Sequence, residues 1–324
     1  MIRFRLASWL ALAVTLPSVA FAQAPNFLLT WGSRGAGDGQ FNNPYGVAIG
    51  PSGYLYVADA FNDRVQKFTL SGAYVAQWGT NGIGTGQFDE VLAVTVDPGG
   101  NVFLSDNVNQ RIQKFTADGT FLLTWGSQGT GDGQFNFPRG IAADGAGNVY
   151  ACDLQNNRVQ KFTNDGVFIR AWGQTGTSPG LFLFPTDVAV DASANVYVAD
   201  ADNNRVQKFD STGVFLTTWG SGGTGNGQFF GPKGLNVAPD GSVYVSDDLN
   251  DRIQKFTSDG TFLAVWGATG TGDGFFKSPR GIATDPDGNI YVADRLNHRI
   301  QKFGYQVAVQ ATTWGKLKRL YGTE

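Results

Sequence analysis

The chain has 324 residues, with 24 basic and 27 acidic side chains and a formal net charge of −3. A slightly acidic protein is a poor match for nucleic acid or for anionic membrane surfaces, because both are usually bound through basic patches. The single cysteine, Cys152, excludes an intramolecular disulfide, and we expect it to be a small buried side chain.

The first 22 residues have the layout of a secretory signal peptide. Arg3 and Arg5 precede an apolar run over 6–19, and Ala-Phe-Ala at 20–22 places small residues at a cleavage point before Gln23. The apolar run is shorter than the roughly 20 residues that span a bilayer, and no later segment is continuously apolar enough to cross one. The sequence therefore predicts an exported protein, periplasmic or secreted, without a membrane span.

A Trp-Gly pair recurs every 47 residues without a single insertion. The six pairs begin at Trp31, Trp78, Trp125, Trp172, Trp219 and Trp266. A fixed period of this length indicates tandem copies of one unit, none of which buries its apolar face alone. Residues 23–303 are therefore expected to form six repeats of one domain.

Each unit is predicted to contain four short strands. In the third copy, runs rich in apolar and β-branched residues occupy 138–144, 148–153, 158–162 and 167–172, and Gly, Asp and Asn separate them. No segment shows a convincing helical period. Six four-stranded antiparallel sheets of constant size pack most simply around a common axis, which gives an all-β, six-bladed β-propeller.

The two ends of the repeat region predict how the ring closes. Residues 27–32 repeat residues 121–126 letter for letter, so they form a fourth strand without the three that should precede it. The last unit has three good strands, which end at Phe303, and then loses the pattern. We therefore expect the N-terminal strand to lie on the outside of the last blade. A rival donor is the segment 307–314, within a C-terminal tail at 304–324, because it also ends in Thr-Thr-Trp.

The last copy contains Pro-Arg-Gly-Ile-Ala at 279–283, Gly-Asn-Ile-Tyr-Val-Ala-Asp at 288–294 and Asn-His-Arg-Ile-Gln-Lys-Phe at 297–303. This phrase resembles the NHL repeat, and it recurs at fixed spacing in all six copies. The resemblance implies a six-bladed propeller, here of the secreted bacterial type. It does not imply one function, because the family includes RNA-binding domains, extracellular sensor domains and amidating lyases.

Each repeat carries an aspartate at the end of its second strand and an arginine five residues later, with an asparagine between them. The pairs are Asp59–Arg64, Asp106–Arg111, Asp153–Arg158, Asp200–Arg205, Asp247–Arg252 and Asp294–Arg299. Six copies of one set suit a scaffold better than a single active site. The carboxylate can accept hydrogen bonds from the arginine while the asparagine binds loop backbone, so we predict a structural role.

The remaining motifs give little support to catalysis. The Gly-rich loop at 129–135 has no following helix that would bind phosphate, and half of its copies lack a carboxylate that would bind calcium. A tight turn is expected there, with calcium as the alternative and no other cofactor. The only histidine, His298, occupies a loop position that is Asp, Asn or Gln in the other copies. A zinc site or an activated nucleophile would lack partners, so we predict no catalytic residues and no metal ligands.

Positions that vary between the repeats are the candidates for ligand binding. The second residue of each first strand, which follows proline in every copy but the second, should lie at the channel mouth, on the face with the longer loops. Around the ring it reads Tyr45, Leu92, Arg139, Thr186, Lys233 and Arg280. Asp187 stands where glycine is usual. We predict a site for an anionic or polar ligand at Tyr45, Arg139, Asp187, Lys233 and Arg280. The alternative is that these are exposed variable positions without a ligand.

The predicted function is that of a secreted binding or scaffolding module, and a non-enzymatic role is favoured over an enzymatic one. Its partner would be an extracytoplasmic protein, peptide or glycan and not nucleic acid, and the protein itself would be a monomer. The alternative is a lactonase- or lyase-like enzyme with an oxygen-ligated metal on the axis, bound by side chains such as Asp187 and Asn236.

Overall fold

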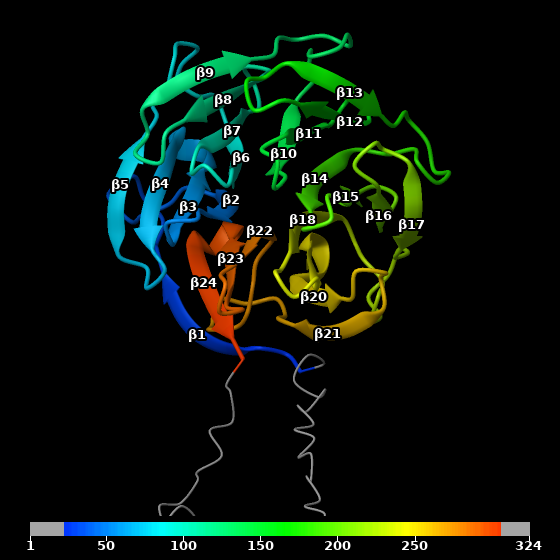
Figure 1. Cartoon of the computed structure of the whole chain (residues 1–324). Helices are drawn as coiled ribbons and strands as arrows, with labels where there is room; N and C mark the ends of the chain where they lie inside the picture. The colour runs from blue at the N-terminus through cyan, green and yellow to red at the C-terminus, as the bar shows by residue number, and fades with distance from the viewer. Residues whose placement is uncertain (1–22, 306–324) are drawn as a thin grey trace, which may run out of the picture.

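The computed structural model describes residues 23–305, which form 24 β-strands and three single-turn 3-10 helices. The strands make six four-stranded sheets, arranged as blades around a central axis (Figure 1). This confirms the predicted all-β, six-bladed propeller. The described residues contain no helix that is long and apolar enough to cross a membrane. The predicted signal peptide at 1–22 and residues 306–324 of the predicted tail lie outside the described residues.

Each blade runs from an innermost first strand to an outermost fourth strand. Blade 1 contains β2 (Pro44–Ile49), β3 (Tyr54–Asp59), β4 (Arg64–Thr69) and β5 (Tyr74–Trp78). Blade 2 contains β6 (Val91–Val96), β7 (Val102–Asp106), β8 (Arg111–Phe115) and β9 (Phe121–Trp125). Blade 3 contains β10 (Pro138–Ala143), β11 (Val149–Asp153), β12 (Arg158–Phe162) and β13 (Phe168–Trp172).

The second half of the ring repeats this order. Blade 4 contains β14 (Pro185–Val190), β15 (Val196–Asp200), β16 (Arg205–Phe209) and β17 (Phe215–Trp219). Blade 5 contains β18 (Pro232–Val237), β19 (Val243–Asp247), β20 (Arg252–Phe256) and β21 (Phe262–Trp266). Blade 6 contains β22 (Pro279–Thr284), β23 (Ile290–Asp294), β24 (Arg299–Gly304) and β1 (Asn26–Trp31). The short helices η1 (Ala60–Asn62), η2 (Asp248–Asn250) and η3 (Arg295–Asn297) follow the second strands of blades 1, 5 and 6.

The position of a strand within its blade explains its hydrophobic pattern. The second strand β11 is buried along its whole length, because neighbouring blades cover both of its faces. The outer strand β9 alternates between half-buried and exposed residues, because only one of its faces packs on a blade. Cys152 of β11 is fully buried as a free thiol between blades 3 and 4, where it packs with Phe182 and Val198. It therefore fills space in the core, as predicted from the sequence.

Contacts to the next blade explain why the Trp-Gly pair recurs. Trp125, at the end of β9 in blade 2, packs on Phe162 of blade 3 with ring centroids 5.7 Å apart. A Cβ atom on Gly166, in the next blade's turn, would lie 2.8 Å from the indole ring. Gly126 has a φ of +104°, and a Cβ atom there would lie 2.8 Å from the ring of Phe135. Glycine is therefore needed at both positions for the outer strand to pack against the following blade.

The N-terminal strand closes the ring, as predicted. β1 pairs antiparallel with β24 and so supplies the fourth strand of blade 6. Figure 1 shows β1 along the outer edge of β24, next to blade 1. Trp31 joins the two ends of the ring, since its indole lies 6.1 Å from the ring of Phe68 in blade 1 and 6.3 Å from that of Tyr291 in blade 6. The rival donor, 307–314, lies outside the described residues.

One face of the ring carries the longer loops. In blade 3, Pro138 at the start of β10 pairs with Asp153 at the end of β11. The loops that enter the first strand and those that leave the second strand therefore lie on the same side in every blade. We call this side the looped face. The opposite side carries the tight turns between first and second strands.

Candidate binding site at the channel mouth

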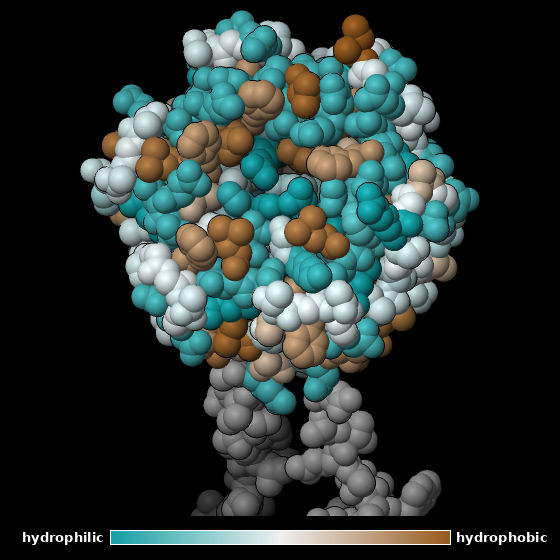
Figure 2. Space-filling view, turned by 180° about the vertical axis from the view of Figure 1, so that it is seen from behind, coloured by the Kyte–Doolittle hydropathy of each residue, from teal (hydrophilic) through white to brown (hydrophobic). Residues whose placement is uncertain are grey.

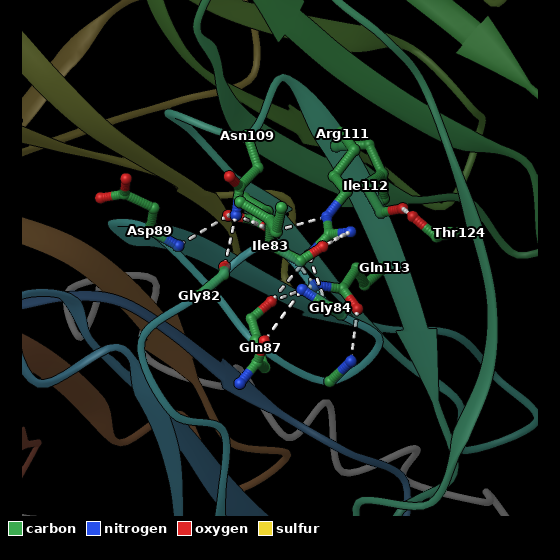
Figure 3. A network of polar contacts seen from close by, with 12 residues as sticks. Gly82, Ile83, Gly84, Gln87, Asp89, Asn109, Arg111, Ile112, Gln113 and Thr124 are labelled. Atoms are coloured by element: carbon green, nitrogen blue, oxygen red, sulfur yellow. Dashed lines mark hydrogen bonds and ion pairs between the residues drawn. The ribbon is translucent and has the colours of Figure 1, made fainter.

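The looped face rests on a hydrogen-bond network that recurs in every blade, and Figure 3 shows it in blade 2. Arg111 donates through Nε to the buried carboxylate of Asp106 at 2.7 Å. Its Nη1 and Nη2 atoms donate to backbone carbonyls of the Gly-rich loop at 82–87, over 2.8–2.9 Å. Asn109 and Gln113 donate to the same carboxylate at 2.9 and 3.0 Å. The network thus fixes the loop to the end of the second strand.

The same Asp–Arg distance of 2.7 Å recurs in all six blades. Each aspartate has no solvent contact, which is costly for a carboxylate unless several donors surround it. Burial raises the pKa of Asp106, while the Asp89 N–H and the Arg111 and Asn109 side chains lower it. The sequence reasoning missed Gln113, which is fully buried in this network. Its spacing, two residues after Arg111 on one strand face, was the available signal.

The Gly-rich loops use their carbonyl oxygens to bind arginine. In blade 2 the guanidinium of Arg111 occupies three of these oxygens, which are the groups that a loop-bound calcium ion would need. Among residues 23–305, no three His, Cys, Asp or Glu side chains converge on a position that would hold a metal ion. Calcium at these loops stays a prediction, and it would have to compete with the guanidinium groups.

A second recurring contact joins each blade to the next. The residue before each third strand has a left-handed backbone, and its side chain accepts a backbone N–H from the following blade. In blade 6 this residue is His298, whose Nδ1 accepts from the Asn43 N–H of blade 1 at 3.1 Å. The acceptors of the other five blades are Asp63, Gln110, Asn157, Asn204 and Asp251. His298 therefore contributes a hydrogen bond to the closure of the ring.

We expect the ring to lose stability through His298 as the pH falls. Burial, followed by the positive charge of Arg34, lowers the pKa of His298 below its ordinary value of about 6.5. The unfolded chain therefore binds a proton at a pH where the folded chain keeps Nδ1 free, so stability is full above pH 6.5 and decreases below it.

The variant His298→Asn, which carries the residue type of blades 3 and 4, keeps an acceptor that does not titrate. Urea midpoints measured from pH 8 to pH 5 should diverge in favour of this variant as the pH decreases. Parallel curves for the two proteins would contradict the assignment.

The structure brings the variable first-strand positions together at the mouth of the channel. Tyr45, Arg139, Asp187 and Lys233 line a narrow throat of about 20 Å³. Tyr45, Arg139 and Arg280 also line a wider pocket of about 300 Å³. The five predicted residues thus lie around one opening, and their role in binding stays a prediction.

Tyr45 contacts two arginines from other blades. The guanidinium carbon of Arg139 is 5.2 Å from the centre of the Tyr45 ring, and that of Arg280 is 5.1 Å from it. Arg139 Nη2 also donates a hydrogen bond to the Tyr45 hydroxyl. In such cation–π contacts the aromatic ring attracts each guanidinium group, which offsets part of the repulsion between the two positive charges. The three side chains therefore form one cluster across the mouth, although they come from blades 1, 3 and 6.

Asp187 forms the boundary between the throat and an axial cavity of about 190 Å³. Its carboxylate accepts the backbone N–H groups of Val188 and Leu235 at 2.9 and 2.8 Å. Burial raises the pKa of Asp187 to about 7, although the two N–H groups lower it in part. A Cβ atom on Gly140 would lie 2.4 Å from the Asp187 carboxylate, so blade 3 needs glycine here. The acid is thus held by backbone donors beneath the basic mouth.

The sequence reasoning missed two charged residues of the mouth. Arg295 lines the wider pocket beside Glu90, and Asp248 pairs with Arg280 Nη2 at 3.2 Å. Both directly follow the repeat aspartate at the end of a second strand, a position that is alanine in blades 1 and 4. A comparison of this position around the ring was the signal that could have found them. The mouth therefore has more ion pairs than the first-strand residues alone indicated.

Exposed apolar side chains surround this mouth over four consecutive blades. They occupy one position in the loops that leave the second strands. They are Leu249, Leu296, Phe61 and Val108, with exposed fractions of 59%, 48%, 47% and 40%. On the face of the ring that Figure 2 shows, hydrophilic side chains surround the centre and separate hydrophobic groups lie around them. We call these four residues the apolar arc.

Comparisons with known proteins agree with this architecture. The NHL repeat family matches residues 135–162, 182–209 and 276–303. The E3 ubiquitin-protein ligase TRIM71 of Rattus norvegicus is 40% identical over 47 residues, which is 14% of this chain and 6% of that protein. The chain thus matches only a small part of this curated relative.

Two solved structures share the fold at low sequence identity. A streptogramin B lyase structure has a TM-score of 0.58 and 16% identity, and the match covers 84% of this chain and 95% of the lyase. A chain of a nidogen/laminin complex has a TM-score of 0.54 and 18% identity, covering 68% of this chain and 79% of that one. These likenesses concern the fold alone. With the repeats matched and the ring described, the chain is an NHL-repeat protein that folds as a six-bladed β-propeller.

Proposed function

We propose that the protein is an exported, non-enzymatic binding module whose looped face binds a polypeptide segment of an extracytoplasmic partner. The observation that carries the proposal is the pocket of about 300 Å³, where Arg139, Arg280 and Arg295 meet beside the apolar arc. Convergent polar groups in a concave site with an apolar rim are typical of ligand sites. The predicted signal peptide supports export.

A rigid scaffold beneath this face also favours binding. The loops that surround the pocket are fixed by the Asp–Arg networks, so little conformational entropy would be lost when a ligand binds. The lactonase- or lyase-like alternative finds less support at the axis. Asp187 is engaged by two backbone N–H groups, and the Asn236 side-chain oxygen accepts a hydrogen bond from Thr284 at 2.9 Å.

Selection from a random peptide library displayed on phage tests the proposal directly. The mature protein is expected to enrich peptides that bind the looped face. Replacing Phe61, Leu249 and Leu296 with serine should weaken their binding at least about 10-fold, because even one such side chain that the peptide buries contributes about 1.5–3 kcal/mol.

The matched control replaces Val167 and Val214, which are 62% and 58% exposed, with serine. Both lie in tight turns on the opposite side of the ring, so this variant should bind the selected peptides with unchanged affinity. No enrichment, or equal losses in the two variants, would argue against a peptide site on the looped face. Enrichment from a glycan array in place of peptides would redirect the proposal to a glycan.

A further inference from the structure

The arginines at the mouth have buried donor atoms without an acceptor. Arg139 Nε, Arg280 Nε and Nη1, and Arg295 Nε have no hydrogen-bond partner among residues 23–305. Arg280 is only 7% exposed. Buried polar groups in proteins are nearly always hydrogen-bonded, and charged donors most of all. The three arginines line one pocket, and their unpaired donors therefore indicate that an acceptor binds at this mouth.

Each of the two central guanidinium groups is held in place by contacts at one end. Arg280 Nη2 is fixed by Asp248 at 3.2 Å, and Asp248 in turn accepts a hydrogen bond from the Ser278 hydroxyl. Arg139 Nη2 is fixed by the Tyr45 hydroxyl. The Nε atoms, and Nη1 of Arg280, stay free. The two side chains are thus oriented before any ligand arrives, which reduces the entropy lost on binding.

The residues that line the mouth include more cations than carboxylates. The cations are Arg139, Lys233, Arg280 and Arg295, and the carboxylates are Glu90, Asp187 and Asp248. Burial, and then the charges of Arg280 and Arg295, lowers the pKa of Arg139 to about 9. Burial and the same kind of repulsion lower the pKa of Lys233 to about 8. Burial also raises the pKa of Asp187 to about 7, so this carboxyl group carries only part of a negative charge near neutral pH, and the mouth as a whole complements an anionic group.

We propose that Arg139 and Arg280 bind one carboxylate group of the ligand, so that an acidic side chain or a C-terminus of a polypeptide enters the mouth while neighbouring residues pack on the apolar arc. This inference rests on the proposed function. The planar guanidinium presents paired N–H groups that match the two oxygens of a carboxylate, and burial strengthens such charge-assisted hydrogen bonds. The arc favours a carboxylate carried on a chain with apolar side chains over a free inorganic ion.

Nitrogen-15 NMR of the arginine Nε–H groups in the mature protein measures this binding directly. The probes are N-acetylglutamic acid α-amide, which has only a side-chain carboxylate, and N-acetylglycine, which has only a terminal one. N-acetylglutamine amide is the neutral control, and inorganic phosphate is the competing anion. We expect one or both carboxylates to shift the Arg139 and Arg280 signals at millimolar concentration, and the stronger of the two identifies the group. The neutral amide should leave both signals unchanged.

Variants of Arg139 connect the signals to the proposed contact. Arg139→Gln should weaken carboxylate binding by about 30-fold or more, because it removes a buried charged partner. Arg139→Lys keeps the charge but loses the paired donors, so it should restore only part of the affinity. Arg170→Gln, on the outer strand β13, is the control and should bind like the unmodified protein. Arg139 forms no ion pair with a carboxylate among residues 23–305, so Arg139→Gln should fold, which its NMR spectrum will show.

Three results would overturn the inference: tighter binding of phosphate than of either carboxylate, equal binding of the neutral amide, or unchanged affinity in Arg139→Gln. The outcome is separable from that of the phage selection. The selection could yield peptides that bind the looped face but place no carboxylate near the arginines. That result would support the polypeptide function and refute the carboxylate contact. Carboxylate binding without any selected peptide would support the contact and refute the polypeptide function.

Discussion

Replacing Asp153 with alanine is expected to lower the free energy of unfolding by about 3–5 kcal/mol, although the residue contacts no candidate ligand site. Its carboxylate accepts from Arg158 Nε at 2.7 Å, from Asn156 at 2.9 Å and from Gln160 at 3.2 Å. It also accepts the Asn136 N–H at 2.7 Å. The alanine variant leaves all four donors, one of them charged, without this acceptor in a buried position. The variant Asp153→Asn keeps one acceptor oxygen and should therefore lose less stability.

Asp165→Ala is the matched control for this experiment. It removes the same carboxylate, but its side chain is 84% exposed and lies 3.9 Å from Lys114 Nζ. Pairs of this kind contribute about 0–1 kcal/mol, so its urea unfolding curve should nearly coincide with that of the unmodified protein. A loss below about 1 kcal/mol in Asp153→Ala would contradict the assigned role. Because the 2.7 Å contact recurs, Asp59→Ala in blade 1 should give a loss of similar size.

The blades could be predicted from the sequence because equivalent residues of consecutive blades keep a fixed separation along the chain. The period of 47 residues aligns each residue with five counterparts, and strand limits follow from the turns. Even the closing strand was predicted, since residues 27–32 copy 121–126. Residues that vary, such as Arg139 and Arg280, were found by the same alignment.

Contacts across the axis could not be predicted in this way. Arg139 donates to Tyr45 over a separation of 94 residues, which is twice the repeat. Whether two such side chains meet depends on the width of the channel and on side-chain length, and a repeat period contains neither quantity. Asp248 and Arg295 were missed because they lie in the second-to-third loops, where each begins a single-turn 3-10 helix, and only the first-strand positions were considered for the channel mouth. The alignment therefore predicts equivalence of positions and not contact between them.

A chain that begins at Gly32, and so lacks β1, is expected to lose stability on the order of 5 kcal/mol. Phe27, Leu29 and Trp31 each bury part of their side chains against blade 6 or blade 1, at about 1.5–3 kcal/mol for full burial of each. The deletion also leaves the edge of β24 unpaired. A free edge binds other strands, so we expect dimers or larger species in light scattering, and faster amide exchange in β24.

A chain that ends at Tyr305 is the control that separates the two candidate donors of the closing strand. It keeps β1 and also keeps the Tyr305 hydroxyl, which accepts a hydrogen bond from Lys255 at 3.2 Å. If β1 closes the ring, this chain should unfold at the same urea concentration as the mature protein, and only the N-terminal deletion should be destabilised. If the segment 307–314 were the donor, the C-terminal deletion would be destabilised and the N-terminal deletion would not.

A third outcome is that each deletion alone is harmless and both together are not. Either segment could then close blade 6, and β1 would not be required. The placement of Trp31 argues against that exchange, because its indole contacts Phe68 and Tyr291 at the same time, so the loss of β1 opens the contact between the first and last blades.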